Sequence, residues 1–344
     1  MRNTALLFIS IFFTLTGHAQ KATADVQVLS NGTKTSLRGL SVVTDNIIWV
    51  SGSNGTVGRS MNGGKNWTWM TVKGFEKNDF RDIEAFDATT AVIMSVAEPA
   101  YILKTNDAGA TWKVVYENKS KGMFLDAMEF WNREAGIVIG DPVDGRFFIT
   151  RTFDNGSTWH DIPFEKRPLA DSGEACFAAS GTNVRALDRD EAVFVSGGLR
   201  SELYIRDQRT TLPVIQGKET TGANSIAVWD RYKAHGAKSF VITGGDFNAD
   251  SSSEKNCFYS HNNGKTWHAP ATRPHGYRSC VEYLYSKMEL VSCGLTGVDY
   301  SGDGGVNWKW VSKESFHVCR KAKAGTAVFF AGNNGRIGKL IWKP

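Results

Sequence analysis

Short runs of apolar residues recur along the whole chain, and each run ends in a turn-forming stretch. Seven such runs are present, centred near residues 49, 92, 137, 193, 241, 290 and 328, with examples such as "IIWVSGSNG", "AGIVIGDPVDG" and "AVFFAGNNG". Runs this short, bounded by Gly, Asn and Pro, predict buried β-strands, and no helical periodicity competes with them. One strand precedes each run, as in "FRDIEAF", and shorter ones follow, as in "RFFITR" and "TWHDIP".

The spacing of these units, about 40–50 residues, predicts the architecture. Four strands per unit at this spacing are typical of a propeller blade, so we predict an all-β chain that forms a single seven-bladed β-propeller over residues 20–344, with four antiparallel strands per blade. The last unit ends at "GRIGKLIWKP", short of one strand. Residues 22–30 are expected to supply that strand and close the ring, because closure removes exposed strand edges.

A polar motif, Ser/Thr-x-Asp/Asn-x-Gly-x-x-Trp, occurs five times, starting at residues 60, 105, 152, 260 and 301. Its hydroxyl and its acid or amide suit hydrogen bonds to the backbone of a tight hairpin, its Gly suits a positive φ, and its Trp suits burial between strands. A feature repeated around a ring is expected to be structural and to lie on one face. We expect loss of a buried hairpin hydrogen bond in Asp154→Ala to cost about 1–2 kcal/mol. The residues predicted to have this role are Asn62, Asp107, Asp154, Asn262 and Asp303, with Trp67, Trp112, Trp159, Trp267 and Trp308.

This motif makes the chain similar to the Asp-box (BNR) propellers. That superfamily includes sialidases, xyloglucan-active hydrolases and the photosystem II assembly or stability factors. The sequence most resembles the bacterial relatives of the last group, in the segments "SLRGLSVV", "FRDIEAFDATTAV", "DPVDGRF", "FAASGTN" and "YRSCVEYL". The resemblance extends over nearly the whole chain after residue 20. It implies the propeller fold, and a role in binding partner polypeptides through an arginine patch; the superfamily hosts unlike functions on one scaffold.

The face opposite to the motif hairpins is where a site is expected. The loops that enter the innermost strands open there, and they bring polar residues to the mouth of the central channel. These guanidinium groups either pair with acids such as Asp82, Glu84, Glu129 and Glu282 or bind an anion such as a carboxylate, sulfate or phosphate. The predicted ligand-binding residues are Arg38, Arg81, Asp126, Arg146, Arg185, Asn224, Arg278 and His317.

Loops on the same face supply candidates for catalysis. If the chain is a sialidase-like glycosidase or another enzyme acting on acidic glycans, Tyr277 is the candidate nucleophile and Glu174 its partner. Asp141 and Asp144, in "GDPVDGRF", are further candidates. A sialidase-type arginine context is absent around Arg38, which lies in "LRGL".

An oxidoreductase is the third alternative, since some relatives are described as such. No Gly-x-Gly-x-x-Gly follows a strand, no haem-attachment CxxCH occurs, and the histidines lack metal-ligand spacing. We therefore expect no cofactor and no metal. The five cysteines include no CxxC pair; they are interpreted as buried small side chains, one pair of which could be oxidised.

Composition and the N-terminus set the remaining expectations. The chain has 344 residues, 35 Gly and 11 Trp, typical of a turn-rich β protein, and its net charge of +5 with no long basic cluster gives no reason to expect nucleic acid. Residues 1–19 resemble a signal peptide cleaved near Ala19, and no later segment has the length of a transmembrane helix. We expect an exported, monomeric protein whose partner is an anionic small molecule, an acidic glycan or an envelope protein.

Overall fold

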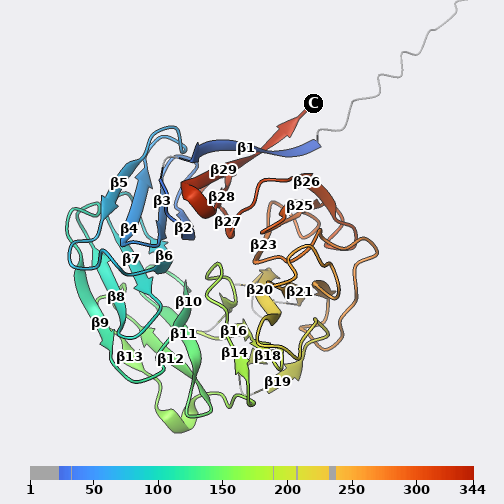
Figure 1. The fold of residues 1–344 in the computed structure, drawn as a ribbon, viewed down its shortest axis with the longest axis horizontal. Helices are drawn as coiled ribbons and strands as arrows, with labels where there is room; N and C mark the ends of the chain where they lie inside the picture. Colours follow the sequence, from blue (N-terminus) through green and yellow to red (C-terminus); the bar gives the residue numbers. More distant parts are fainter. Residues whose placement is uncertain (1–22, 32, 189, 207, 232–237) are drawn as a thin grey trace, which may run out of the picture.

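The structure, a computed structural model, describes residues 23–31, 33–188, 190–206, 208–231 and 238–344. The predicted signal peptide lies outside the described residues. Seven β-sheets are arranged around one axis (Figure 1). The first strands of neighbouring sheets contact each other around the ring, from β2 to β6 and onward to β27, which returns to β2. The predicted seven-bladed, all-β propeller is confirmed.

Each blade is an antiparallel sheet that runs outward from the axis. Blades one to three follow the chain without interruption. Their strands are β2 (Leu37–Val42), β3 (Ile48–Gly52), β4 (Thr56–Ser60) and β5 (Thr68–Thr71); β6 (Phe80–Ala85), β7 (Ala91–Ser95), β8 (Ala100–Thr105) and β9 (Lys113–Asn118); and β10 (Leu125–Phe130), β11 (Gly136–Val143), β12 (Arg146–Thr152) and β13 (His160–Asp161).

Blades four and five differ from a simple repeat. Blade four contains β15 (Val184–Ala186), β16 (Ala192–Val195), β18 (Glu202–Ile205) and β19 (Gln208–Thr211). Blade five contains β20 (Thr221–Trp229), β21 (Ser239–Asp246) and β22 (Cys257–Ser260), and two short strands, β14 (Glu174–Ala175) and β17 (Gly197–Gly198), extend its inner edge. Its outer position holds an isolated bridge between Tyr259 and His268. The turn η1 (Phe164–Lys166) lies in the long connection before blade four.

The last two blades bring the chain ends together. Blade six contains β23 (Cys280–Tyr283), β24 (Leu290–Gly294), β25 (Gly297–Ser301) and β26 (Lys309–Ser312). Blade seven contains β27 (Val318–Lys321), β28 (Val328–Ala331), the turn η2 (Asn333–Gly335) and β29 (Arg336–Lys343). The N-terminal strand β1 (Thr23–Asn31) pairs antiparallel with β29, and Figure 1 shows the two lying side by side at the rim. The prediction that the N-terminal residues complete the last blade is confirmed.

The motif hairpins join the third and fourth strands of their blades. In blade three, the Thr152 hydroxyl accepts a hydrogen bond from the Gly156 amide at 3.0 Å and donates one to Asp154 at 2.9 Å. Asp154 also accepts from the amide of Thr158 at 2.9 Å. Thr152 is fully buried, whereas Asp154 is exposed. The hydrogen bonds of Asp154 are therefore exposed or partly buried rather than buried as expected, because the hydroxyl occupies the interior of the hairpin and the carboxylate lies on its outside.

The other four hairpins repeat this arrangement. Their Ser or Thr hydroxyl accepts from a Gly amide four residues later, and it bonds the acid or amide at 2.8–3.2 Å. Trp159 and Trp308 are buried in the core, and Trp67, Trp112 and Trp267 pack against it partly exposed. Among the described residues, no helix has the length and hydrophobicity needed to cross a membrane.

Candidate functional site at the mouth cavity

A cavity of about 420 Å³ lies among the first residues of the inner strands, on the face opposite to the motif hairpins. We call it the mouth cavity. Six of the residues that sequence analysis placed at the site line it, and its remaining wall is largely aromatic and apolar. The six predicted residues are Arg38, Arg81, Asp141, Asn224, Tyr277 and His317, and the apolar wall includes Phe124, Phe177, Phe247 and Leu295.

Arg38 is the cation of this cavity that is not neutralised by an acid. It is half-buried, and its Nη1 donates to the Ala179 carbonyl at 3.2 Å. None of the described carboxylates forms an ion pair with it. Burial lowers the pKa of the Arg38 guanidinium, and the nearby charge of Arg81 adds to this effect. A guanidinium remains charged under such conditions, so the cavity carries a positive charge that an anion would stabilise.

Arg81 is partly committed to a neighbour. Its Nε donates to Asp79 Oδ2 at 2.7 Å, and both side chains are about 30% exposed. Its guanidinium also lies over the Phe124 ring, 5.9 Å from the centroid. Because the pair is reached by solvent, its net energy is small, and the other nitrogens of Arg81 remain able to bind a ligand.

His317 and Tyr277 are neutral members of the cavity. His317 Nε2 lies 2.8 Å from Asn333 Oδ1 and 3.3 Å from the Ser36 hydroxyl. Burial, together with the charges of Arg38 and Arg81, lowers the pKa of His317 to about 3, so its imidazole is uncharged at neutral pH. The Tyr277 hydroxyl donates to Asn224 Oδ1 at 2.7 Å, and burial raises the pKa of that hydroxyl.

Two acids with raised pKa values belong to this part of the structure: Asp141 in the cavity wall and Asp126 behind it. Asp141 Oδ1 accepts from the Cys176 amide at 2.8 Å, and burial raises the pKa of Asp141 to about 6. Asp126 is fully enclosed and does not line the cavity. Burial raises the pKa of Asp126 well above its usual range, and the charge of Asp141 raises it further. The two acids therefore do not supply two full negative charges to offset the arginines.

The structure does not bring Arg278 to the mouth. In blade six, Cys280 pairs with Cys293, as Gly39 pairs with Ser51 in blade one, so Ser279 occupies the position of Arg38. Arg278 lies one residue earlier and its side chain points to the opposite side of the strand. It is fully buried, and its Nε donates to Asp299 at 2.7 Å.

Arg185 lies at the other end of its strand. It pairs with Val193 as Ser41 pairs with Trp49, which places it three residues beyond the position of Arg38. Its guanidinium is buried and lies 3.5 Å from Glu129 and 3.0 Å from Glu282. The predictions for Arg278 and Arg185 are wrong because the sequence does not show which residues of the first and second strands pair in blades four and six. That pairing decides which residue of the inner strand faces the mouth.

Three other candidates also lie outside the mouth cavity. Arg146 donates to the Arg167 carbonyl at 2.6 Å, and Asp144 is exposed in a turn. Glu174 is buried, accepts from the Tyr204 hydroxyl at 2.8 Å and from the Asp171 amide at 2.9 Å, and burial raises its pKa. The Tyr277 hydroxyl is bonded to Asn224 instead, so the two candidate catalytic residues, Tyr277 and Glu174, do not form a hydrogen-bonded pair in the described structure.

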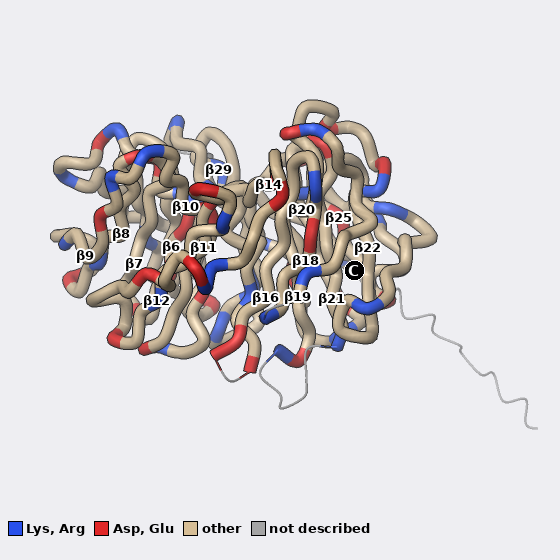
Figure 2. Tube along the Cα trace, turned by 90° about the horizontal axis from the view of Figure 1, so that it is seen from below, with Lys and Arg blue, Asp and Glu red and all other residues tan. Residues whose placement is uncertain are grey.

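A second cavity, of about 720 Å³, lies at the hairpin end of the inner strands. Several of its acids and bases are paired with each other, as in the Arg185 contacts to Glu129 and Glu282 and the contact of Lys323 with Glu84. Figure 2 shows Lys and Arg positions interspersed with Asp and Glu positions along the Cα trace. Of the two predicted alternatives, neutralisation of an arginine by acids is therefore correct for Arg185 at the hairpin end of the channel. It is wrong for Arg38 at the mouth.

The aromatic part of the mouth cavity was not predicted from the sequence. Phe124 directly precedes β10, so the rule that located Arg38 could have found it. Phe177 and Phe247 lie in connections of blades four and five, and their rings meet edge-on at 5.8 Å. No local pattern marks this contact, because it joins loops that are 70 residues apart in the chain.

Comparison with known proteins identifies the repeat and the fold. The BNR/Asp-box repeat family matches residues 258–269. YCF48 bound to D1 peptide superposes with a TM-score of 0.63 at 15% identity, covering 92% of this chain and 96% of that one. YCF48 from Cyanidioschyzon merolae gives 0.65 at 16%, covering 92% and 98%. The WD40 β-propeller domain of Doa1 gives 0.60 at 12%, covering 95% and 98%. No curated protein matches the sequence.

Proposed function

We propose that this seven-bladed Asp-box (BNR) propeller binds a partner polypeptide at the mouth cavity. Its role would be that of a binding or assembly factor. The fold likeness to YCF48, one structure of which is bound to a D1 peptide, supports a polypeptide as the partner. The mixed character of the cavity supports the same choice, since aromatic walls and a few polar groups suit a peptide end with its side chains.

The single observation that carries the proposal is the unneutralised charge of Arg38. It lies beside Arg81 in a partly enclosed cavity that also contains neutral donors. A carboxylate is the anion that a polypeptide offers, and a guanidinium binds it through paired hydrogen bonds. We therefore infer that the partner presents a carboxylate, at its C-terminus or on an acidic side chain, to Arg38 and Arg81.

The place of action is part of the proposal. If residues 1–19 act as a signal peptide, the partner is an envelope or secreted protein. Immunoblotting of cell fractions checks this independently of binding: export predicts a mature chain that begins near Gln20 outside the cytoplasm.

A peptide array tests the carboxylate inference. Each peptide is presented with a free C-terminal carboxylate and as its amide, and the purified chain is applied at moderate salt. We expect retention of free acids to exceed that of amides by at least about tenfold, the effect of losing one charged hydrogen-bonded pair. Arg38→Gln should abolish the difference, because it removes the charge and keeps a polar side chain.

Arg146→Gln is the matched control, since Arg146 is on the same face and outside the cavity. Its peptide binding should equal that of the parent chain. Equal retention of acids and amides by the parent chain, or equal loss in both variants, would contradict the assignment of the site.

One observation favours a second candidate, an enzyme acting on acidic glycans. Asp141 lines the cavity with a pKa raised to about 6 by burial, a value suited to a general acid, and Arg38 could hold a sugar carboxylate. Incubation with sialosides and uronic-acid glycans at high protein concentration tests it. Turnover that is lost in Asp141→Asn supports this candidate, and an absence of products removes it.

A further inference from the structure

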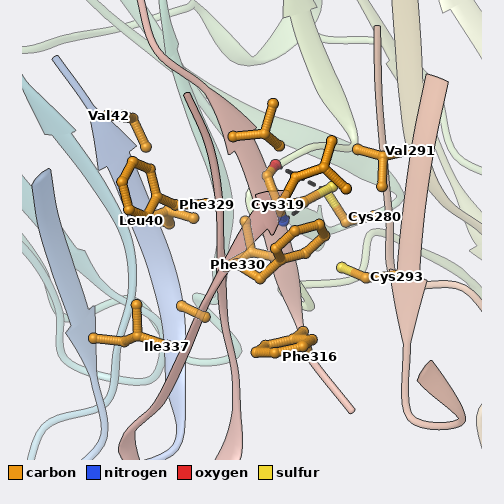
Figure 3. Close-up of a cluster of buried hydrophobic side chains, with 14 of the residues drawn as sticks. Leu40, Val42, Cys280, Val291, Cys293, Phe316, Cys319, Phe329, Phe330 and Ile337 are labelled. Carbon is orange, nitrogen blue, oxygen red and sulfur yellow. Dashed lines mark hydrogen bonds between the residues drawn. The ribbon is translucent and has the colours of Figure 1, made fainter. Parts of the chain in front are cut away.

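Three buried cysteines from two neighbouring blades meet at one point. Cys280 on β23 is directly paired with Cys293 on β24, so both side chains lie on the same face of blade six. Cys319 on β27, in blade seven, faces them, and its sulfur lies 3.5 Å from that of Cys280. All three sulfurs lie within 4.8 Å of one another. Figure 3 shows the three side chains with the Phe316 and Phe330 rings beside them.

This thiol cluster, Cys280, Cys293 and Cys319, differs from an ordinary set of buried cysteines. All three side chains are fully enclosed and free of disulfides. Cys176 and Cys257 are equally buried, but they do not belong to a group of this kind. The cluster could not be found from sequence spacing, because its members are 13 and 26 residues apart and meet only through the pairing of β23 with β24 and the contact of blade six with blade seven.

Two groups around the sulfurs could stabilise a bound metal–thiolate group. Cys280 accepts from the Cys319 amide at 3.4 Å. Arg320 follows Cys319 on β27, and its Nη1 has no hydrogen-bond partner in the described structure. The charge of Arg320, which also acts on Asp82, Glu129 and Glu282, would offset part of the negative charge of a metal–thiolate group.

We propose that the thiol cluster is a binding site for a soft monovalent cation, Cu(I), held by three sulfur ligands between blades six and seven. Metal–sulfur bonds of about 2.3 Å place three trigonal ligands about 4 Å apart, close to the separations observed here. Each thiol that becomes a ligand releases its proton to solvent. The bound ion would join the inner strands of blades six and seven.

The ligand set decides the choice of metal. Thiolate ligands select Cu(I) and Zn(II) over Mg(II), Ca(II) and Mn(II), which prefer oxygen. A structural zinc site is closed by four ligands, and a zinc site with three protein ligands keeps a water in the fourth position. No fourth His, Cys, Asp or Glu belongs to the cluster among the described residues. The three cysteines lie in the apolar core that includes Phe316, Phe330 and Val291, and the Thr182 hydroxyl, 3.7 Å from Cys280 Sγ, is a single polar neighbour where a bound water needs two or more. Three-coordinate Cu(I) needs neither a fourth protein ligand nor a bound water.

Metal content of the full chain tests the proposal. The chain is produced with added copper and, in parallel, with added zinc, then purified without oxygen and challenged with the Cu(I) chelator bicinchoninate. We expect one copper per chain that resists the chelator, and no zinc. X-ray absorption at the copper edge should give three sulfur neighbours, and the copper-loaded chain should unfold at a temperature higher by at least about 5 °C, because the ion binds the native state alone.

Two variants distinguish the cluster from any accessible thiol. Cys319→Ser should lose copper, whereas Cys257→Ser, which removes a buried cysteine outside the cluster, should retain it. If Cys319→Ser fails to fold, the sulfur count in the parent chain decides the matter. Absence of copper in the parent chain, nitrogen or oxygen neighbours at the copper edge, preferential zinc binding, or equal loss in Cys257→Ser would overturn the proposal.

Discussion

The carboxyl of Asp82 is enclosed near the hairpin end of the inner strands. Its Oδ2 accepts from the Met128 amide at 2.8 Å and its Oδ1 accepts from its neighbour Ile83 at 2.9 Å. Burial raises the pKa of Asp82 to about 7; the charge of Arg320 and the two amides oppose this, and Glu129 adds to it. The folded state therefore holds a proton that the unfolded chain releases near pH 3.8.

A dependence of stability on pH follows at this residue. A raised pKa gives a contribution that is fully present below pH 3.8 and is lost as the pH rises to about 7, with a limit of about 4 kcal/mol at 1.4 kcal/mol per pH unit. Asp82→Asn should remove this decline whatever its absolute stability. Urea unfolding of both chains between pH 4 and 8 measures the difference, and parallel pH curves would contradict the prediction.

At the residue scale, sequence analysis could find polar residues at inner-strand starts but could not fix their register in every blade. Arg38 and Arg81 were placed correctly because "LRGL" and "FRDI" begin strands of the regular blades. The predicted position of Arg278 along its strand is wrong by one residue. Because side chains on a strand alternate between its two faces, the Arg278 side chain lies in the core instead of the cavity. Raised pKa values such as that of Asp141 depend on burial by distant segments and have no local signature.

At the scale of the element, the motif hairpin depends more on its hydroxyl than on its acid. Thr152→Val keeps the shape of the side chain and leaves the buried Gly156 amide without an acceptor, which should cost about 1–3 kcal/mol. Asp154→Ala removes hydrogen bonds from an exposed position and should cost less, about 1 kcal/mol. Chemical denaturation of the two variants compares them. A larger loss of unfolding free energy in Asp154→Ala than in Thr152→Val would show that the carboxylate stabilises the hairpin more than the hydroxyl does.

The repeat explains why elements were predictable and where prediction failed. Seven similar apolar runs and five hairpin motifs fix strand number and order, because each repeats the same burial and turn chemistry. The strands β14 and β17 have no equivalent in other blades and consist of two residues each. They form where Gly198 and Gly222 let backbones approach closely, which depends on tertiary contacts rather than on strand-forming residues.

At the scale of the whole molecule, ring closure rests on β1. This strand pairs with β29 along its length, and Val26 belongs to the core that blades one, six and seven share. A chain that begins at residue 33 leaves the outer edge of β29 unpaired and uncovers that core. We expect a clear fall in the unfolding temperature and a tendency to associate, measured by calorimetry and light scattering. A chain that begins at residue 23 is the control and should match the mature protein. Unchanged melting after loss of β1 would contradict its closing role.

The two ends of the ring differ in how their charges are neutralised, and the proposed function belongs to the end where Arg38 has no ion-pair partner among the described residues. The most direct test is a crystal structure of the chain with the free-acid peptide that it retains most strongly. We expect a peptide carboxylate bonded to Arg38 and Arg81, with peptide side chains against Phe177 and Phe247. A peptide bound at the hairpin end, or bound in the mouth cavity with its carboxylate turned away from both arginines, would contradict it.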